Sequence, residues 1–276
     1  GGYCLDESSD ALSEAGISMN LTTRYAAQHL CVLSTVDSTN NYLKQRAADL
    51  PHGYAVVADC QTAGRGRLGR SFVSPSGSGI YISLLLRPNI PLERMHLMTV
   101  GAAIAACEAI QETAGFTPDI KWVNDVLMHG KKLCGILTEA SIEAETGQLS
   151  YVIVGIGLNV RTPAGGLAPE IADIAGCLED FAPHAVRRNA LAASFFNHME
   201  SCCDLIAAGQ TDALIDRYRS FIHFLGQPIT VIRFDKREPA TAVGIDSNGH
   251  LIIEQNGQRS TLVAGEISIR LPEQTR

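Results

Sequence analysis

The residues best suited to chemistry lie in an arginine- and glycine-rich run, QTAGRGRLGR, at residues 61–70. Glycines alternate with Arg65, Arg67 and Arg70, so neither helix nor strand is favoured there. The guanidinium fork suits phosphate and carboxylate, and glycine lets the backbone approach a ligand closely. The run therefore predicts a mobile loop that binds an anionic small molecule. The alternatives are a solvated flexible loop and an arginine-glycine segment attracted to RNA.

Three further segments carry polar residues beside expected strands. They are DSTN at 37–40, KWVND at 121–125 and KKLCGIL at 131–137. Each also has a structural explanation when it is taken alone. Ser38 or Thr39 can cap a helix, and Asn124 with Asp125 can form a turn at a strand end. Lys132 can be an ordinary solvated lysine at the start of an apolar strand.

The composition is that of a globular protein, with 276 residues of which 46% are hydrophobic and 18% charged. The balance of 22 basic against 29 acidic residues gives a net charge of −7. Nonspecific binding of nucleic acid over the whole surface is therefore disfavoured, and anion binding must be local. The eight cysteines have neither CxxC pairs nor zinc-type spacing, which indicates reduced thiols and a cytoplasmic location.

The elements that must position these residues alternate irregularly along the chain. Apolar runs predict strands, and helical spacing with capping signals predicts helices. The strands are expected at 31–36, 54–59, 80–86, 133–137 and 151–156, and the helices at 40–49, 91–112, 188–208 and 212–221. This order predicts an α+β fold with a mixed sheet and helices rather than repeated βα units.

The chain changes character after residue 222. Short segments rich in isoleucine, valine and threonine are separated by the turn signals DSNG and NG. They predict strands at 228–234, 240–245, 250–254 and 259–263. We therefore expect a small β-barrel at the C-terminus.

The order and combination of these segments resemble those of the biotin protein ligases. The matching motifs are DSTN, QTAGRGRLGR, KWVND, KKLCGIL, GIGLN at 155–159 and GEISIR at 265–270. The resemblance implies a catalytic domain at 31–222, with the mixed sheet and helices of class II synthetases, followed by an SH3-like barrel at 223–276. Residues 1–30 are then the remnant of an N-terminal domain and its linker.

The resemblance also implies a reaction. Biotin and ATP form biotinyl-5′-AMP, and a lysine of a biotin carboxyl carrier protein then displaces AMP. Because two anions must meet in the first step, fixed cations and Mg²⁺ are needed to stabilise charge on the phosphate. The catalytic residues implied by the family motifs are Lys132, Arg65, Arg67 and Asp125.

Binding residues follow from the same motifs. For biotin they are Ser38, Thr39, Asn40, Gln61, Gly64, Arg65, Gly66, Arg67, Lys132 and Gly135. For the nucleotide they are Arg67, Arg70, Phe72, Asn124, Lys132 and Asn159. Trp122 is a candidate wall for the apolar chain of biotin, and the metal ligands are not identified. Phe72 stands where many members have tryptophan, and Val123 replaces the proline of the family motif KWPND.

Two other functions stay open. A lipoate ligase uses a similar adenylation, although the complete arginine-glycine loop and the barrel favour biotin. A biotin-responsive repressor would carry a DNA-binding domain ahead of the ligase, and GGYCL at 1–5 resembles the last strand of such a domain. DNA binding is then expected only through this missing part. A homodimer is also expected, because family members commonly dimerise.

Overall fold

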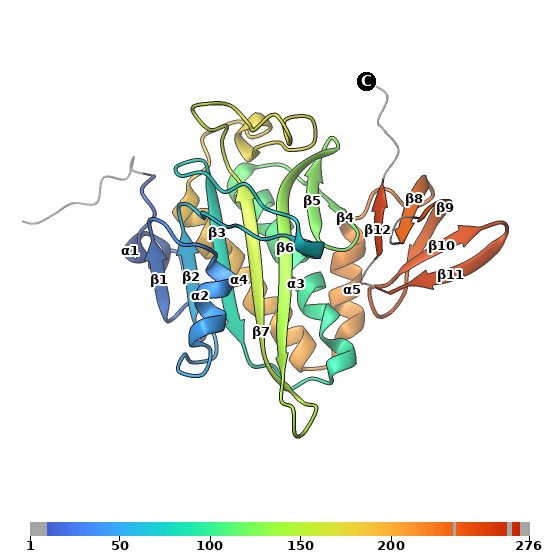
Figure 1. Cartoon of the computed structure of the whole chain (residues 1–276), viewed down its shortest axis with the longest axis horizontal. Helices are drawn as coiled ribbons and strands as arrows, with labels where there is room; N and C mark the ends of the chain where they lie inside the picture. Colours follow the sequence, from blue (N-terminus) through green and yellow to red (C-terminus); the bar gives the residue numbers. More distant parts are fainter. Residues whose placement is uncertain (1–9, 234–235, 264–266, 271–276) are drawn as a thin grey trace, which may run out of the picture.

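The computed structural model describes residues 10–233, 236–263 and 267–270. The expected wing strand at 1–5 lies outside the described residues. A seven-stranded mixed sheet in the order β1-β2-β3-β7-β6-β5-β4 forms the centre of the larger domain (Figure 1). Only β1 and β2 are parallel neighbours. The strands are β1 (Leu30–Leu33), β2 (Ala55–Ala58), β3 (Gly79–Leu86), β4 (Asp119–Lys121), β5 (Asp125–Met128), β6 (Lys131–Ile142) and β7 (Leu149–Asn159).

Helices cover both faces of this sheet. Figure 1 shows α2 in front of the central strands and α3 and α4 behind them. The α-helices are α1 (Glu14–Ser18), α2 (Thr39–Arg46), α3 (His96–Ala114), α4 (Arg188–Ala207) and α5 (Thr211–Ser220). Three short 3₁₀ helices are η1 (Arg67–Gly69), η2 (Leu92–Arg94) and η3 (Leu178–Asp180). In the described part of the chain, no helix has both the length and the apolarity to cross a membrane.

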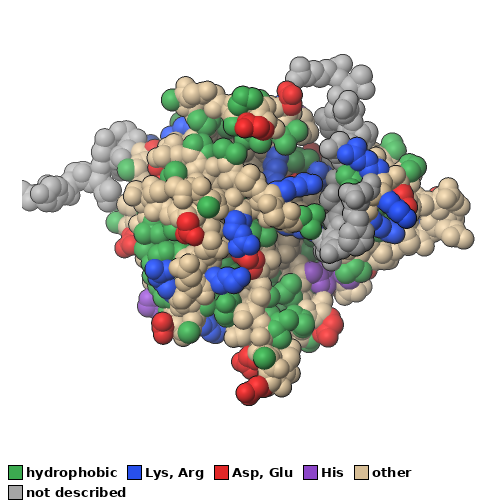
Figure 2. Space-filling model, in the orientation of Figure 1, with side chains coloured by type: hydrophobic (Ala, Val, Ile, Leu, Met, Phe, Trp, Pro, Cys, Tyr) green, Lys and Arg blue, Asp and Glu red, His purple; other side chains and the backbone are tan. Residues whose placement is uncertain are grey.

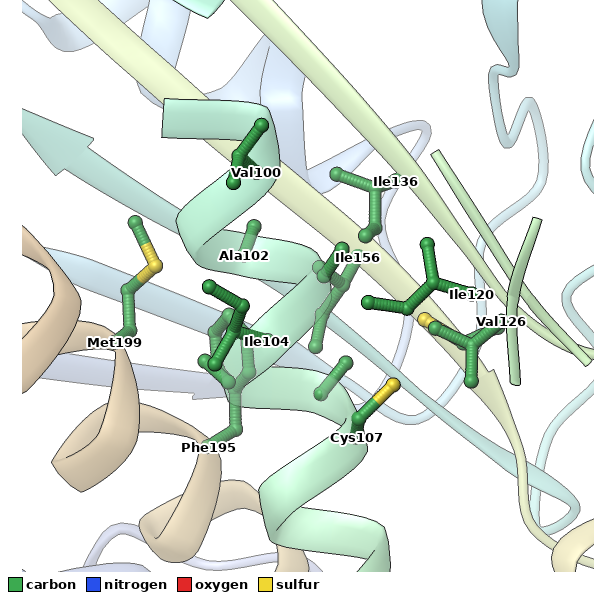
Figure 3. Packing of buried hydrophobic residues seen from close by; sticks show 14 of the residues in the cluster. Val100, Ala102, Ile104, Cys107, Ile120, Val126, Ile136, Ile156, Phe195 and Met199 are labelled. Atoms are coloured by element: carbon green, nitrogen blue, oxygen red, sulfur yellow. The ribbon is translucent and has the colours of Figure 1, made fainter. Parts of the chain in front are cut away.

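The strands place alternate side chains on the two faces, as the period of two requires. Ala55 and Val57 of β2 join the large core, whereas Val56 joins a smaller core with Leu43 of α2. The large core fills the space between the sheet, α3 and α4 (Figure 3). Because α3 packs against both the sheet and α4, it is buried around most of its circumference.

The second sheet is antiparallel throughout, in the order β11-β10-β9-β8-β12. Its strands are β8 (Pro228–Arg233), β9 (Lys236–Ile245), β10 (Leu251–Gln255), β11 (Gln258–Leu262) and β12 (Ile267–Arg270). The turn between β9 and β10 lies against the larger domain, where the indole Nε1 of Trp122 donates to the Gly249 carbonyl oxygen at 3.1 Å. Arg219 Nη2 donates to the Ile245 carbonyl oxygen at 2.8 Å.

These observations confirm the predicted fold class, but several predicted element bounds were wrong. The helix expected at 40–49 ends at Arg46. Strands β6 and β7 run for 12 and 11 residues, well beyond the apolar runs at 133–137 and 151–156. Residues 138–142 of β6 pair with residues 149–154 of β7, which no pattern within β6 itself indicates. The hairpin of β4 and β5 was missed because its strands have three and four residues. The domain boundary near residue 222 stays a prediction.

A histidine between two glutamates joins α3 to α4. Nδ1 of His198 lies 3.1 Å from Glu108 Oε2, and Nε2 lies 3.1 Å from Glu112 Oε2. The hydrogen bond to Glu108 is the main cause that raises the pKa of His198 above 6.5, although burial opposes it. The stabilising contribution of protonated His198 is therefore fully present at pH values below the pKa that His198 has in the unfolded state. That contribution is lost as the pH rises through the higher native pKa.

The substitution His198→Gln should therefore destabilise the protein in a pH-dependent way. We expect a loss of about 0.5–1 kcal/mol in the free energy of unfolding near about pH 6, and a smaller loss near about pH 9. Urea unfolding of the wild-type and variant proteins at both pH values measures the difference. An equal loss at the two pH values would contradict the ionic role of His198.

Candidate functional site

Two adjoining cavities open on the α2 face of the main sheet. Their volumes are about 50 Å³ and about 220 Å³. Both are lined by Gly66, Arg67, Phe72, Asn124 and Lys132, so these residues stand where the two spaces meet. Figure 2 shows Lys and Arg side chains gathered around a hollow on this face, beside hydrophobic side chains. The arrangement can hold one elongated ligand or two ligands end to end, with cations at the junction.

Glycines of the central strands form the floor of the smaller cavity. Gly155 pairs with Ser83 on β3, and Gly157 pairs with Gly135 on β6. A Cβ at Gly157 would lie 2.5 Å from Phe72 Cε1, and a Cβ at Gly155 would lie 2.2 Å from Asn40 Oδ1. The absence of side chains at both positions therefore lets an aromatic ring and an amide lie directly on the sheet.

Polar groups from the start of α2 line the smaller cavity. Thr39 N donates to Gln61 Oε1 at 2.9 Å, and Gln61 Nε2 donates to Ser74 Oγ at 3.0 Å. Ser38 stands at the N-cap position of α2, as predicted, but its side chain makes no capping hydrogen bond. Its hydroxyl is thus not used by the helix, while the residue lines the cavity. Donors and acceptors of a neutral polar ring can be matched here.

The arginine-glycine loop folds over the junction. Gly66 N donates to the Arg70 carbonyl oxygen at 2.7 Å, and Phe72 N donates to the Gly64 carbonyl oxygen at 2.9 Å. At its tip is η1, where Leu68 has a φ of 56° and is 59% exposed. The expectation that neither helix nor strand extends through this run is confirmed, apart from this single 3₁₀ turn.

The loop arginines point to different partners. Arg67 Nη1 donates to Asn124 Oδ1 at 2.9 Å, and burial lowers the pKa of its guanidinium. Arg65 Nη1 donates to Asn41 Oδ1 at 3.0 Å and lies 3.4 Å from Glu139 Oε1. A partly desolvated guanidinium such as that of Arg67 attracts an anion more strongly than a solvated one does.

Lys132 is held at the junction from both ends. Its backbone N donates to the Ile174 carbonyl oxygen at 2.7 Å, which fixes the start of β6. Its Nζ lies 2.6 Å from Asp125 Oδ1 and 5.9 Å from the centre of the Phe72 ring. A single ammonium group thus faces both cavities, beside one carboxylate.

The larger cavity has a polar side and an apolar side. Lys121, Asp125 and Arg70 contribute charge, whereas Trp122, Val73, Ile171, Ile174 and Ala175 contribute apolar surface. Asn159 Nδ2 donates to the carbonyl oxygens of Lys132 and Gly176, at 3.3 and 3.2 Å. Asn159 therefore ties β7 to the segment that closes this cavity.

The structure brings most of the predicted site residues together. Those on the smaller cavity are Ser38, Thr39, Asn40, Gln61, Arg65, Gly66, Arg67, Phe72, Asn124, Lys132 and Gly135. Arg70, Asp125 and Asn159 line only the larger one. Gly64 lines neither cavity; a Cβ there would lie 2.3 Å from the Phe72 carbonyl oxygen, so it permits the loop to close on itself. Trp122 lies on the larger cavity rather than the smaller.

Sequence reasoning missed part of the floor. Gly155, Gly157 and Leu137 line the smaller cavity but were not among the predicted site residues. The signal was present in the glycines of GIGLN, because glycine inside a strand marks a close approach. Among the described residues, no group of three metal-ligating side chains occurs. Asp125 supplies a carboxylate to the larger cavity.

Comparison with protein families gives two matches. Residues 32–159 match the "Biotin/lipoate A/B protein ligase family". Residues 224–270 match the "Biotin protein ligase C terminal domain". The first match contains both glycine-rich motifs of the cavities, and the second contains the five strands of the smaller sheet.

Individual proteins are similar over most of the chain. The Bacillus subtilis protein described as "Bifunctional ligase/repressor BirA" is 36% identical, over 97% of this chain and 82% of that relative. The "Biotin--[acetyl-CoA-carboxylase] ligase" of Mycobacterium tuberculosis is 29% identical over 87% of this chain and 88% of its own length. A solved structure, "Biotin protein ligase from Aquifex aeolicus in complex with biotin and ATP", superposes with a TM-score of 0.78 at 27% identity. It covers 89% of this chain and 100% of that one.

Proposed function

This chain belongs to the biotin protein ligase family, and we infer that it catalyses the ATP-dependent attachment of biotin to a protein lysine. It forms biotinyl-5′-AMP from biotin and ATP and passes biotin to a biotin carboxyl carrier protein. The observation that supports this most directly is the junction of two cavities at Lys132 and Arg67. One cavity suits a small neutral ring, and the other has the size and charge for a nucleotide.

Each step of the reaction places charge at this junction. An oxygen of the biotin carboxylate attacks the α-phosphorus of ATP, and pyrophosphate leaves. The amine of the acceptor lysine then attacks the biotinyl carbonyl carbon, and AMP leaves with the bonding electrons. Because carboxylate and phosphate repel each other, Lys132 and Arg67 favour the first step by attracting both.

We propose that the two substrates bind in different cavities. The ureido ring of biotin enters the smaller cavity, where Ser38, Thr39, Asn40 and Gln61 supply hydrogen bonds, and Arg65 closes over it. The nucleotide occupies the larger cavity near Arg70 and Asn159. Phe72 lines both cavities, so in this proposal its ring separates the substrates as well as contacting the adenylate.

The donor set fits Mg²⁺ that enters with ATP. Magnesium in nucleotide sites is typically held by one or two carboxylates, substrate phosphate oxygens and waters. Asp125, with Asn124 beside it, supplies a carboxylate and an amide oxygen at the larger cavity. When bound, the ion would offset negative charge on the phosphates.

Three further proposals concern the setting of the enzyme. All seven described cysteines are free thiols, which supports a cytoplasmic location. The similarity to a Bacillus subtilis ligase/repressor supports a full-length protein that also represses transcription, with DNA bound by a preceding domain. A homodimer is proposed from the family resemblance. The reading frame upstream of residue 1 tests the proposed DNA-binding domain, and sedimentation with and without biotin tests the proposed homodimer.

The enzyme activity itself has a direct test. Incubation with labelled biotin, ATP, Mg²⁺ and a biotin carrier domain is expected to label one lysine of the carrier, as mass spectrometry can locate. Replacement of biotin by lipoate separates the alternative, since a lipoate ligase would transfer lipoate instead. Transfer of lipoate without transfer of biotin, or no transfer to the carrier lysine, would refute the proposed function.

A further inference from the structure

The amide of Asn40 is fixed at the floor of the smaller cavity. Its Nδ2 donates to Glu139 Oε2 at 2.9 Å and to the Leu137 carbonyl oxygen at 3.4 Å. Its Oδ1 lies 2.6 Å from Ser83 Oγ, whose one hydrogen can be donated to it or to Thr39 Oγ1 at 2.7 Å. Both amide hydrogens are thereby used within the protein. One lone pair of the carbonyl oxygen is left.

The orientation of this amide follows from its neighbours. The reverse orientation would place the Asn40 carbonyl oxygen against the Glu139 carboxylate, with an acceptor facing an acceptor. Ser83 is fully buried and Asn40 is 4% exposed, so water cannot relieve that repulsion. Gly155 leaves the space in which Asn40 Oδ1 lies. The Glu139 carboxylate, which can only accept, therefore determines which end of the amide is available to a ligand, and the Ser83 hydroxyl can adapt to that orientation.

We propose that Glu139 is a positioning residue that makes Asn40 a hydrogen-bond acceptor only, so that the cavity selects a ligand with an N–H group at this point. The inference rests on the proposed function, in which the ligand is biotin. A cyclic urea carries an N–H on each side of its carbonyl group. An analogue with a ring oxygen in place of that N–H would set two acceptors against each other and be rejected.

The Glu139 carboxylate also makes ionic contacts, so its charge and its hydrogen bond to Asn40 can be tested separately. Its Oε1 lies 3.4 Å from Arg65 Nη1 and 3.9 Å from Lys44 Nζ, on the outer side of the carboxylate. Glutamine at position 139 would lose the charge that attracts Arg65 but could still accept from Asn40 Nδ2. Alanine would lose both. Lys44 is 57% exposed and contacts the carboxylate without lining either cavity, so Lys44→Ala is a matched control.

The test compares biotin with its two cyclic carbamate analogues, in each of which one ring N–H is replaced by oxygen. For wild-type enzyme we expect one carbamate to be rejected by ~100-fold in kcat/KM for adenylate formation, since a buried acceptor then loses its donor. The double variant Glu139→Ala with Ser83→Ala frees the amide to turn. Its preference for biotin should fall to ~10-fold or less, because Asn40 can then donate to the ring oxygen.

Discrimination is the readout because a purely structural role would slow both substrates in the same proportion. Lys44→Ala should keep the wild-type ratio. Glu139→Gln should lower the ratio less than Glu139→Ala does, because a glutamine amide can still accept from Asn40 Nδ2. If the double variant fails to fold, Glu139→Ala alone should lower the ratio by ~3-fold or more. A ratio that is unchanged in these alanine variants, or a wild-type enzyme that accepts both carbamates as well as biotin, would overturn the proposal. Turnover of biotin itself by wild-type enzyme tests the proposed function separately.

Discussion

Replacement of Lys132 by alanine is expected to abolish adenylate formation and to leave the fold intact. Its Nζ faces both cavities, at the point where carboxylate and α-phosphate meet in the proposed reaction. Loss of one fixed donor at such a point typically costs ~100- to 1,000-fold in rate. The loss should be larger here because Asp125, 2.6 Å from Nζ, would keep its negative charge without the partner cation.

Exchange of labelled pyrophosphate into ATP, which requires biotin, measures the first step alone. The neighbouring Lys131 offers a matched control, since its Nζ donates to the carbonyl oxygens of Ala172 and Asp173, and it lines neither cavity. Lys131→Ala should therefore retain exchange. Near-normal exchange by Lys132→Ala, with a melting curve like that of wild-type protein, would remove Lys132 from the catalytic role.

The second expected result is that Arg67→Gly releases biotinyl-5′-AMP before the acceptor arrives. Arg67 attaches the loop to the KWVND turn through Asn124 Oδ1 and brings a partly buried cation to the junction. Its loss should speed release of the adenylate by ~10- to 100-fold, which corresponds to the free energy of one or two charge-assisted hydrogen bonds. The freed mixed anhydride then reacts with any accessible lysine, or with water.

Two measurements follow from this expectation. Rapid filtration of enzyme loaded with labelled biotin gives the release rate of the adenylate, and labelling of an unrelated bystander protein reports its escape. Arg259→Ala is the control, because Arg259 pairs with Glu254 on the smaller sheet and lines neither cavity. Unchanged retention of the adenylate by Arg67→Gly would show that the loop is held by its other contacts.

Much of the site could be predicted because its residues have unusual types in short runs. Arginine next to glycine at 61–70 indicates an anion site, and the ordered set of six motifs indicates the family. Apolar runs predicted most strands, since burial imposes a pattern within each segment. Where pairing rather than burial extends a strand, as in the second half of β6, the pattern failed.

The sequence by itself determined the chemistry of this protein: cations for two anions, glycines for close approach, and polar groups for a neutral ring. Only the tertiary structure decided which of these groups meet. Ser83, Glu139 and Gly155 look unremarkable in the sequence, yet strand register and the packing of α2 bring all three to Asn40. Hydrogen bonds between distant segments depend on register and side-chain direction. The local pattern of one strand predicts neither its register nor the direction of its side chains relative to a distant segment.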